Sequence, residues 1–378
     1  MPLPSLPPLP SLPLSPFLPS VYPACRGRAR LRGYPCRFFG SGIIIVGPTA
    51  SGKSMLALLL AQMVDGVIIN ADAMQLYRDI PALSDAPQKE RLRAPHRLYG
   101  CMDAATPCSA DLWQRLAHKE IRHAHKNKKI PIIVGGTGLY IRSLLEGLTP
   151  LPAIAPEVRD NVRALATRMP ASSLHETLKA VDPYSAEAIH PKDRQRLARA
   201  WEVFLSSGKP LSWWLARAPR PPRPPRPPRP RHLNTPSSML VVAMEPPRSQ
   251  IYRRCDQRVT RMLARGALQE VEGLHRRNIS PNVPAMKAIG VQSLLAVIKG
   301  ECGLPDALKT IQRDTRHYAK RQYTWQKTQG PRAHIVLRCV PDYANLAQIA
   351  LWLPNAIRHM NRCGQQKSVS IYRQNLLQ

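Results

Sequence analysis

The chain has 378 residues, with 55 Lys and Arg against 24 Asp and Glu and a formal net charge of +31. Residues 1–40 and 219–231 together hold ten of the arginines and no acidic residue, so the rest of the chain still carries +21. This balance argues against an acidic or neutral metabolic enzyme and indicates a polyanionic partner, either nucleic acid or an anionic membrane surface.

Cysteine usage and hydropathy narrow the class of protein further. The eight cysteines are scattered and include no C-x-x-C pair, which supports neither a zinc module nor a disulfide framework. No apolar run approaches the roughly 18 residues that span a bilayer. We therefore expect a soluble, reduced, cytoplasmic protein that has no membrane partner.

The first forty residues are rich in Leu, Pro and Ser and contain five arginines. A signal peptide places its positive charge before the apolar stretch, and dense proline breaks the amphipathic helix of a transit sequence. We interpret residues 1–40 as a disordered leader or an over-long translated start, and leave them out of the fold.

Strands and helices then alternate. Continuous β-branched runs at residues 43–46, 67–70 and 130–134 predict strands that are buried on both faces. Apolar periodicity predicts helices over residues 55–64 and 109–126. This alternation is typical of a doubly wound parallel α/β sheet.

Helical patterns replace strands from about residue 156 to 217, including an amphipathic segment at 193–204. A near-perfect Arg-Pro-Pro repeat at 219–231 predicts polyproline II, as an inert basic loop or a ligand for a proline-binding partner. A strand at 240–244 and helices over 249–329 follow. The expected domains are a leader at 1–40, a catalytic core at 41–145 and 235–330, a helical insertion at 146–218, an Arg/Pro loop at 219–234 and a C-terminal tail at 331–378.

The first strand leads into a phosphate-binding motif. The sequence GPTASGKS at 47–54 matches G-x-x-x-x-G-K-[ST] without a mismatch, between a predicted strand and a predicted helix. Backbone N–H groups of such a loop surround a diphosphate, and the helix N-terminus adds partial positive charge. Lys53 would neutralise phosphate oxygens and Ser54 would hold Mg²⁺. Nucleoside triphosphate is the usual ligand of this motif.

Polar residues also follow the second and third strands. Asp72 follows the strand at 67–70, and Gly135, Gly136 and Thr137 end the strand at 130–134. The carboxyl ends of parallel strands share one edge of the sheet, where ligands bind, so all three strand ends are expected to converge on one site. Asp72 could bind magnesium, accept a proton or cap a helix.

Six stretches carry a wider pattern: GPTASGKS, NADAMQLY, APHRLYG, PIIVGGTGLYIRSLLEGL, DRQRLARAWEVFLSSGKPLS and AKRQYTW. Their order and spacing resemble the tRNA dimethylallyltransferases, also called tRNA isopentenyltransferases. The resemblance runs from about residue 43 to 329 and is broken mainly by the Arg/Pro tract. Only the phosphate loop is specific by itself.

The resemblance implies a P-loop α/β core and a helical insertion that grips the tRNA anticodon stem-loop. It implies transfer of a dimethylallyl group from dimethylallyl diphosphate to N6 of adenosine 37, in tRNAs that read codons beginning with U, with release of diphosphate. It further implies Mg²⁺ as cofactor and Asp72 as the base that accepts the N6 proton. A monomer is expected, because one chain can build the whole site.

The functional positions of the family fall on three groups of residues in this chain. The catalytic group is Asp72 and Thr137. The diphosphate-binding group is Gly47, Thr49, Ala50, Ser51, Gly52, Lys53 and Ser54, with Ser54 also the metal ligand. The tRNA-binding group is Asp72, Ala73, Met74, Gln75, Thr137, Arg159, Gln195, Arg196, Leu197, Ala198, Arg199, Lys287, Gln292, Lys320, Arg321 and Gln322.

The chain departs from the family pattern at three of its contact segments. Ala73 stands where serine is common, Gln292 where arginine is frequent, and Gln326 where a bulky apolar residue is usual. The absence of C-terminal zinc-finger spacing favours a bacterial-type enzyme.

Two alternatives stay open on the residues alone. An ATP-dependent P-loop kinase acting on a small metabolite explains the loop equally well, although it does not explain the basic core. A non-catalytic RNA-binding protein explains the charge, although it leaves the phosphate loop and Asp72 without a use.

Overall fold

The computed structural model describes residues 42–217, 239–339 and 369–371. The predicted leader at 1–40 and the Arg/Pro tract at 219–231 lie outside the described residues. Within the described part, no helix is both long and apolar enough to cross a membrane.

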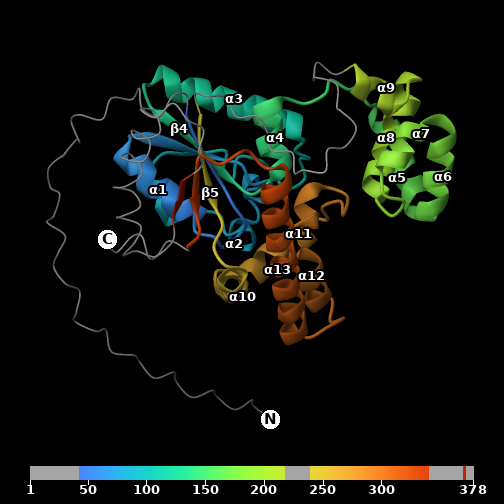
Figure 1. The fold of residues 1–378 in the computed structure, drawn as a ribbon. Coiled ribbons are helices and arrows are strands. Elements are labelled where there is room, and N and C mark those ends of the chain that lie inside the picture. Colours follow the sequence, from blue (N-terminus) through green and yellow to red (C-terminus); the bar gives the residue numbers. More distant parts are fainter. Residues whose placement is uncertain (1–41, 218–238, 340–368, 372–378) are drawn as a thin grey trace, which may run out of the picture. The chain divides into compact units, whose positions relative to one another are not determined.

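The centre of the fold is a seven-stranded sheet in the order β3-β2-β4-β1-β5-β6-β7, in which every pairing is parallel (Figure 1). The strands are β1 (Gly42–Val46), β2 (Gly66–Asn70), β3 (His96–Arg97), β4 (Ile130–Gly135), β5 (Met239–Met244), β6 (Ile335–Leu337) and β7 (Val369–Ile371). The predicted parallel α/β sheet is confirmed. Because β4 lies between β1 and β2, the three expected strand ends are neighbours at one edge.

Helices cover both faces of the sheet, which explains the uninterrupted apolar runs of the strands. Ile43 and Ile45 pack with the buried residues of α1 (Lys53–Met63), whereas Ile44 and Val46 pack with those of α3 (Ala110–Lys126). Ser109 caps α3 by accepting a hydrogen bond from the N–H of Leu112 at 3.1 Å. The predicted helices at 55–64 and 109–126 are therefore present, within about two residues of their expected bounds.

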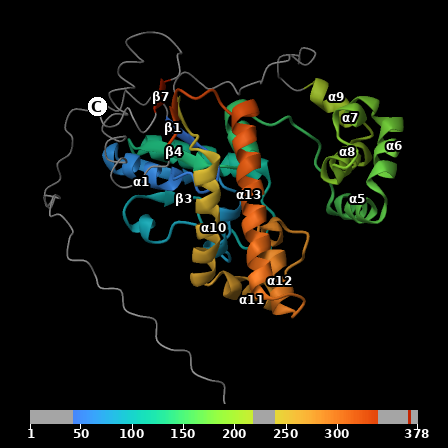
Figure 2. The same cartoon turned by 60° about the horizontal axis from the view of Figure 1, so that its bottom comes forward.

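Short elements connect the strands, and a group of longer helices follows β5. The short elements are η2 (Met74–Leu76), α2 (Pro81–Ser84), η3 (Lys89–Leu92) and α4 (Gly138–Glu146); the later helices are α10 (Arg248–Ala264), α11 (Ala267–Arg276), η4 (Pro284–Lys287), α12 (Val291–Ile298) and α13 (Leu304–Gln329). Helices α10 and α13 pack against each other, and Figure 2 shows them side by side. The helices predicted over 249–329 are thus confirmed.

Residues 156–217 form a helical unit with its own core. Its helices are α5 (Pro156–Arg168), α6 (Ala171–Val181), α7 (Pro183–Ala188), α8 (Arg194–Ser207) and α9 (Leu211–Ala216). Val162, Leu174, Leu178 and Leu197 are among the residues that fill this core. The buried Asp182 ties the unit together, because its carboxylate accepts from the N–H groups of Ser185 and Ser212, both at 3.0 Å. The helical character predicted for this range is confirmed.

The range 331–378, which the sequence analysis assigns to a C-terminal tail, contributes β6 and β7 to the sheet. Strand β6 pairs with β5, and Ile335 and Leu337 are fully buried. The strand has only three residues, and such a run is too short for periodicity to identify.

Gly135 allows a close approach between two strand ends, since a Cβ at this position would lie 2.1 Å from the carbonyl oxygen of Ala71. We expect Gly135→Ala to lower the free energy of unfolding by about 2 kcal/mol or more, because backbone must move to relieve the overlap. Gly273→Ala in α11 is the matched control: its Cβ would meet nothing within 4 Å. Denaturant unfolding of both variants tests this, and a Gly135→Ala protein as stable as the wild type would contradict it.

Candidate functional site

The phosphate-binding loop joins the buried strand β1 to the N-terminus of α1, as the motif requires. Gly52 adopts the left-handed conformation (φ 93°) immediately before α1, and Ala50 also has a positive φ of 63°. Gly47 is pressed against β5, because a Cβ there would lie 2.7 Å from Cβ of Met244. The loop therefore has the turn geometry that points backbone N–H groups toward an anion.

A cavity of about 220 Å³ opens above this loop. It brings together groups from the ends of β1, β2 and β4 and from α10. Its lining includes Thr49, Ala50, Ser51, Gly52, Lys53, Ser54, Asp72, Gln75, Gly135, Tyr99, Arg254, Arg258, Arg261 and Arg265. The expected convergence of the three strand ends is confirmed.

Lys53 places its ammonium group deep in this cavity, where Nζ donates to the carbonyl oxygen of Pro48 at 2.6 Å. Burial lowers the pKa of Lys53 from 10.5 to about 8, and the nearby Asp72 carboxylate opposes this shift. Lys53 is thus poised to gain a stronger charge partner when an anion binds.

Arginines of α10 line the same cavity, and the sequence analysis missed them. Arg254 Nε donates to the carbonyl oxygen of Ala50 at 2.8 Å, and Arg258 Nη1 donates to Thr49 Oγ1 at 2.5 Å. Arg261 and Arg265 complete the row; the spacing of 4 and 3 residues places Arg254, Arg258 and Arg261 on one face of α10, and Arg265 follows four residues later, immediately after the helix ends. This spacing is the signal that would have identified them.

Asp72 is held by a local network at the end of β2. The fully buried Asn70 receives the N–H of Asp72 at 2.8 Å and donates to the carbonyl oxygen of Asp72 at 2.8 Å. The Asp72 carboxylate accepts from the N–H of Met74 at 3.0 Å and also lines the cavity. The side chain thus closes a turn just before η2 and lines the cavity, whereas the N-cap of η2 is Ala73, so Asp72 is not a helix cap.

Thr137 joins the strand ends of β2 and β4. Its hydroxyl accepts from the N–H of Ala73 at 3.0 Å, and its own N–H donates to the carbonyl oxygen of Ala71 at 3.3 Å. Tyr318 from α13, another residue that the sequence analysis missed, forms a side-chain hydrogen bond with Thr137. Burial and the nearby charge of Asp72 raise the pKa of Tyr318. The phenol therefore stays protonated beside the carboxylate.

The donor set at the loop fits a magnesium ion that is bound together with phosphates. Ser54 and Asp72 offer a hydroxyl and a carboxylate to the same cavity, and Ser51 Oγ is buried without a hydrogen-bond partner. No group of three or more His, Cys, Asp or Glu side chains forms a metal cage among the described residues. Magnesium normally takes one or two protein oxygens and completes its shell with phosphates and water, so these residues fit it.

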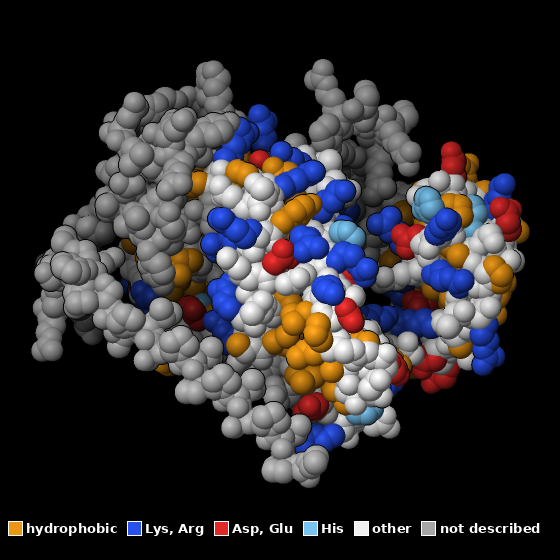
Figure 3. All heavy atoms as spheres, turned by 90° about the horizontal axis from the view of Figure 1, so that it is seen from below, with side chains coloured by type: hydrophobic (Ala, Val, Ile, Leu, Met, Phe, Trp, Pro, Cys, Tyr) orange, Lys and Arg blue, Asp and Glu red, His pale blue; other side chains and the backbone are white. Residues whose placement is uncertain are grey.

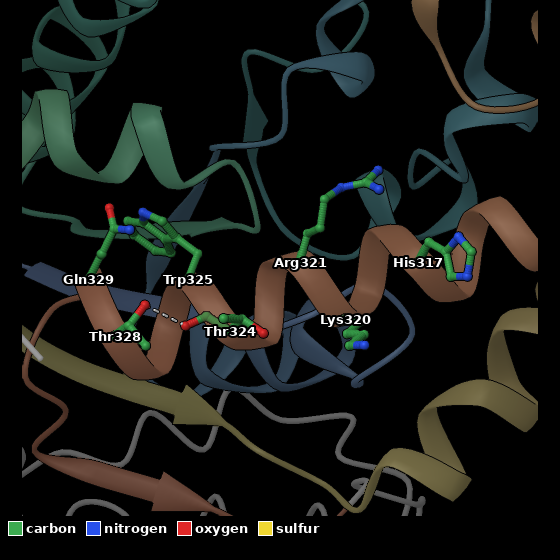
Figure 4. Close-up of a pocket in the computed structure, with 7 residues that line it drawn as sticks. All are labelled: His317, Lys320, Arg321, Thr324, Trp325, Thr328 and Gln329. Atoms are coloured by element: carbon green, nitrogen blue, oxygen red, sulfur yellow. Dashed lines mark hydrogen bonds between the residues drawn. The ribbon is translucent and has the colours of Figure 1, made fainter. Parts of the chain in front are cut away.

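A second cavity, an open groove of about 530 Å³, follows one helix, α13 (Figure 4). Its lining contains Lys320 and Arg321 together with His317, Thr324, Trp325, Thr328 and Gln329. Trp325 packs against the start of α4, since a Cβ on Gly138 would lie 2.4 Å from the indole ring. The groove thus combines positive charge with an aromatic side chain, the combination that suits single-stranded nucleic acid.

The remaining predicted tRNA-binding residues fall in several places. Gln195, Arg196, Lys287 and Gln292 are exposed, Arg159 and Arg199 are half-buried, and Ala73 and Met74 pack against the core. Leu197, Ala198 and Gln322 are buried, so their side chains cannot contact RNA as the sequence analysis expects. The predicted segment at 195–199 lies in α8, and successive residues of a helix point about 100° apart, so five consecutive side chains cannot share one surface.

The surface of the described residues matches the basic composition. Figure 3 shows Lys and Arg side chains widely distributed over the face in view, with Asp and Glu side chains between them. Several cations are neutralised by ion pairs, among them Arg265 with Asp85 at 2.9 Å and Arg196 with Asp193 at 3.3 Å.

The lowered pKa of Lys53 makes a prediction about stability. Without an anion, the charged ammonium disfavours the folded state below about pH 8, and this penalty disappears as the pH rises from about 8 to 10.5. We expect Lys53→Met to stabilise the ligand-free protein at pH 7 by on the order of 2 kcal/mol, because the side chain keeps partial contact with solvent. Urea unfolding at pH 7 and pH 10 measures this.

The exposed Lys126, at the end of α3, provides the control, since Lys126→Met should change stability little at either pH. A gain from Lys53→Met that is the same at both pH values would contradict the linkage to Lys53.

Comparisons with known proteins agree with this site. A model of the IPP transferase family matches residues 75–329. The chain is 43% identical over 290 residues to the tRNA dimethylallyltransferase of Nitrobacter hamburgensis, covering 76% of this chain and 88% of the relative. It is 44% identical over 290 residues to that of Rhodospirillum centenum, with the same two coverages.

A solved structure leads to the same family. The structure of a eukaryotic dimethylallyltransferase acting on tRNA is similar with a TM-score of 0.68 and 25% identity, over 87% of this chain and 82% of that chain. None of these relatives is a small-molecule kinase or a protein that only binds RNA. The chain therefore belongs to the IPP transferase family, the tRNA dimethylallyltransferases.

Proposed function

We propose that the chain transfers the dimethylallyl group of dimethylallyl diphosphate to N6 of adenosine 37, in the anticodon stem-loop of tRNAs that read codons beginning with U. One observation carries the proposal: the phosphate-binding loop and Asp72 line the same cavity. A leaving diphosphate and a proton acceptor are the two things that this transfer requires from the protein.

The phosphate loop holds the leaving group. Backbone N–H groups of residues 52–54, the Lys53 ammonium and the arginines along α10 together neutralise a diphosphate in a partly enclosed cavity. As the bond between C1 of the allyl group and the diphosphate oxygen breaks, negative charge grows on that oxygen. Cations that are already in place stabilise this charge without having to reorganise.

Asp72 accepts the proton that N6 of adenine loses as it forms the bond to C1. The amine is a weak nucleophile, because its lone pair is delocalised into the ring, so placement matters more than basicity. Backbone contacts through Asn70 and Thr137 fix the Asp72 segment. Tyr318 lies near Thr137 and Asp72 and remains protonated there, so it does not compete for the proton.

Ser54 is the residue proposed to hold Mg²⁺. It lines the same cavity as Asp72. The ion supplies charge neutralisation to the diphosphate when it is bound. This role agrees with the hydroxyl at the eighth position of the phosphate-loop motif.

The groove on α13 is the proposed contact for the tRNA. Lys320 and Arg321 supply charge for backbone phosphates, and Trp325 supplies an aromatic surface. The target adenine must leave its stack to reach Asp72, as bases do in other enzymes that modify them. Arg159 and the exposed residues of 195–199 are proposed to contact the stem, and one chain acting as a monomer suffices.

The assignment of Asp72 is testable by substitution. We expect Asp72→Ala to lower turnover by on the order of 10²-fold or more, the range typical of a lost general base, while tRNA affinity changes little. Single-turnover transfer and a tRNA binding titration measure the two effects separately. Near-normal turnover would remove Asp72 from this role.

A matched control lies at the opposite end of β2. Asp65 is exposed and pairs with Lys129 at 2.8 Å, so Asp65→Ala removes a carboxylate remote from the cavity. This variant should retain turnover within about twofold, because surface ion pairs contribute little.

A further inference from the structure

Gln322 lies on α13, one residue after the groove residues Lys320 and Arg321, yet it is only 7% exposed. Its side-chain oxygen accepts from the N–H of Thr49 at 2.7 Å, and its side-chain nitrogen donates to the carbonyl oxygen of Gly136 at 3.0 Å. One amide therefore connects the phosphate loop after β1 to the glycine turn after β4.

The orientation of this amide is fixed by its partners. A backbone N–H can only donate and a backbone carbonyl can only accept, so the oxygen of Gln322 must face Thr49 and its nitrogen must face Gly136. No other residue type offers both groups at this reach. A buried amide that lost one partner would carry an unsatisfied polar group.

The glycine turn is shaped to receive Gln322. A Cβ at Gly136 would lie 2.1 Å from the side-chain nitrogen of Gln322, so only glycine leaves room for the amide. The next residue is Thr137, whose hydroxyl accepts from the N–H of Ala73 beside Asp72. The chain of contacts thus runs from the phosphate loop through Gln322 and Thr137 to the Asp72 segment.

We propose that Gln322 is a positioning residue, which sets the separation between the diphosphate-binding loop and the Thr137–Asp72 side of the site. The proposal rests on the proposed function, because it assigns diphosphate to the loop. Loss of the amide releases the first turn of the loop and weakens diphosphate binding. The residue acts through Thr49 and Gly136 and does not touch the reacting atoms.

The test uses Gln322→Met, which preserves the length of the side chain and removes both hydrogen bonds. We expect its Kd for inorganic diphosphate with Mg²⁺, measured by calorimetry on the full chain, to rise roughly tenfold, the effect of losing a buried hydrogen bond. The KM for dimethylallyl diphosphate should rise with it.

Gln326→Met is the matched control. Gln326 lies one turn further along the same face of α13 and is 5% exposed, but it donates to Glu245 at 3.3 Å and not to the loop. Both variants lose a buried amide from one helix, so a general loss of folded protein would affect both. Only Gln322→Met should raise the Kd for inorganic diphosphate. A lower folded fraction would instead reduce kcat and the number of binding sites, and would leave the Kd of the folded molecules unchanged.

Gln322→Asn carries the test if Gln322→Met does not fold, since it keeps the amide but is one methylene too short to reach both partners. It should also weaken diphosphate binding. If the wild type binds diphosphate tightly and a folded Gln322 variant binds it with the same Kd, the positioning role of Gln322 is wrong, while the diphosphate assignment of the loop stands. No binding by the wild type would overturn the diphosphate assignment of the loop, and this inference with it.

Discussion

The parallel pairing of β2, β4 and β1 is the constraint on which the rest of the site depends. It brings the carboxyl ends of three strands to one edge, so that the phosphate loop, the glycine turn with Thr137 and the Asp72 segment become neighbours. The strand ends leave little space between them, because a Cβ at Gly135 would overlap the backbone of Ala71. Helix packing on both faces holds this edge in place.

Charge is the second organising feature. The cavity collects Lys53 and the row of α10 arginines around a small volume, an arrangement that is unfavourable without an anion. The lowered pKa of Lys53 is the visible sign of this burial. Asp85 already pairs with Arg258 at 3.6 Å and with Arg265 at 2.9 Å, and a bound diphosphate would add negative charge beside Lys53, Arg254 and Arg261. Part of the strong positive charge of the chain therefore serves the small substrate and not only the RNA.

The sequence predicted those parts of the fold and the site that depend on residues close together in the chain. The phosphate loop follows from one contiguous motif, the buried strands from their β-branched runs, and the position of Asp72 from its place after a strand. Gln322 and Tyr318 reach the site from a helix more than 170 residues beyond the residues they contact, so no local pattern predicts these contacts. Arg258 is equally distant from Thr49, and only the spacing of the arginines around it could have indicated its place. Conversely, a contiguous match such as 195–199 overstates the contact surface, because helical geometry buries Leu197 and Ala198.

The most direct test of the account is the chemical product. The purified wild-type chain is incubated with dimethylallyl diphosphate, Mg²⁺ and an unmodified tRNA that carries adenosines at positions 36 to 38. The tRNA is then digested and its nucleosides are identified by mass spectrometry. The account predicts N6-dimethylallyladenosine, formed at position 37 and with one diphosphate released per transfer. A folded protein that binds this tRNA and the diphosphate donor but yields no modified adenosine would contradict it.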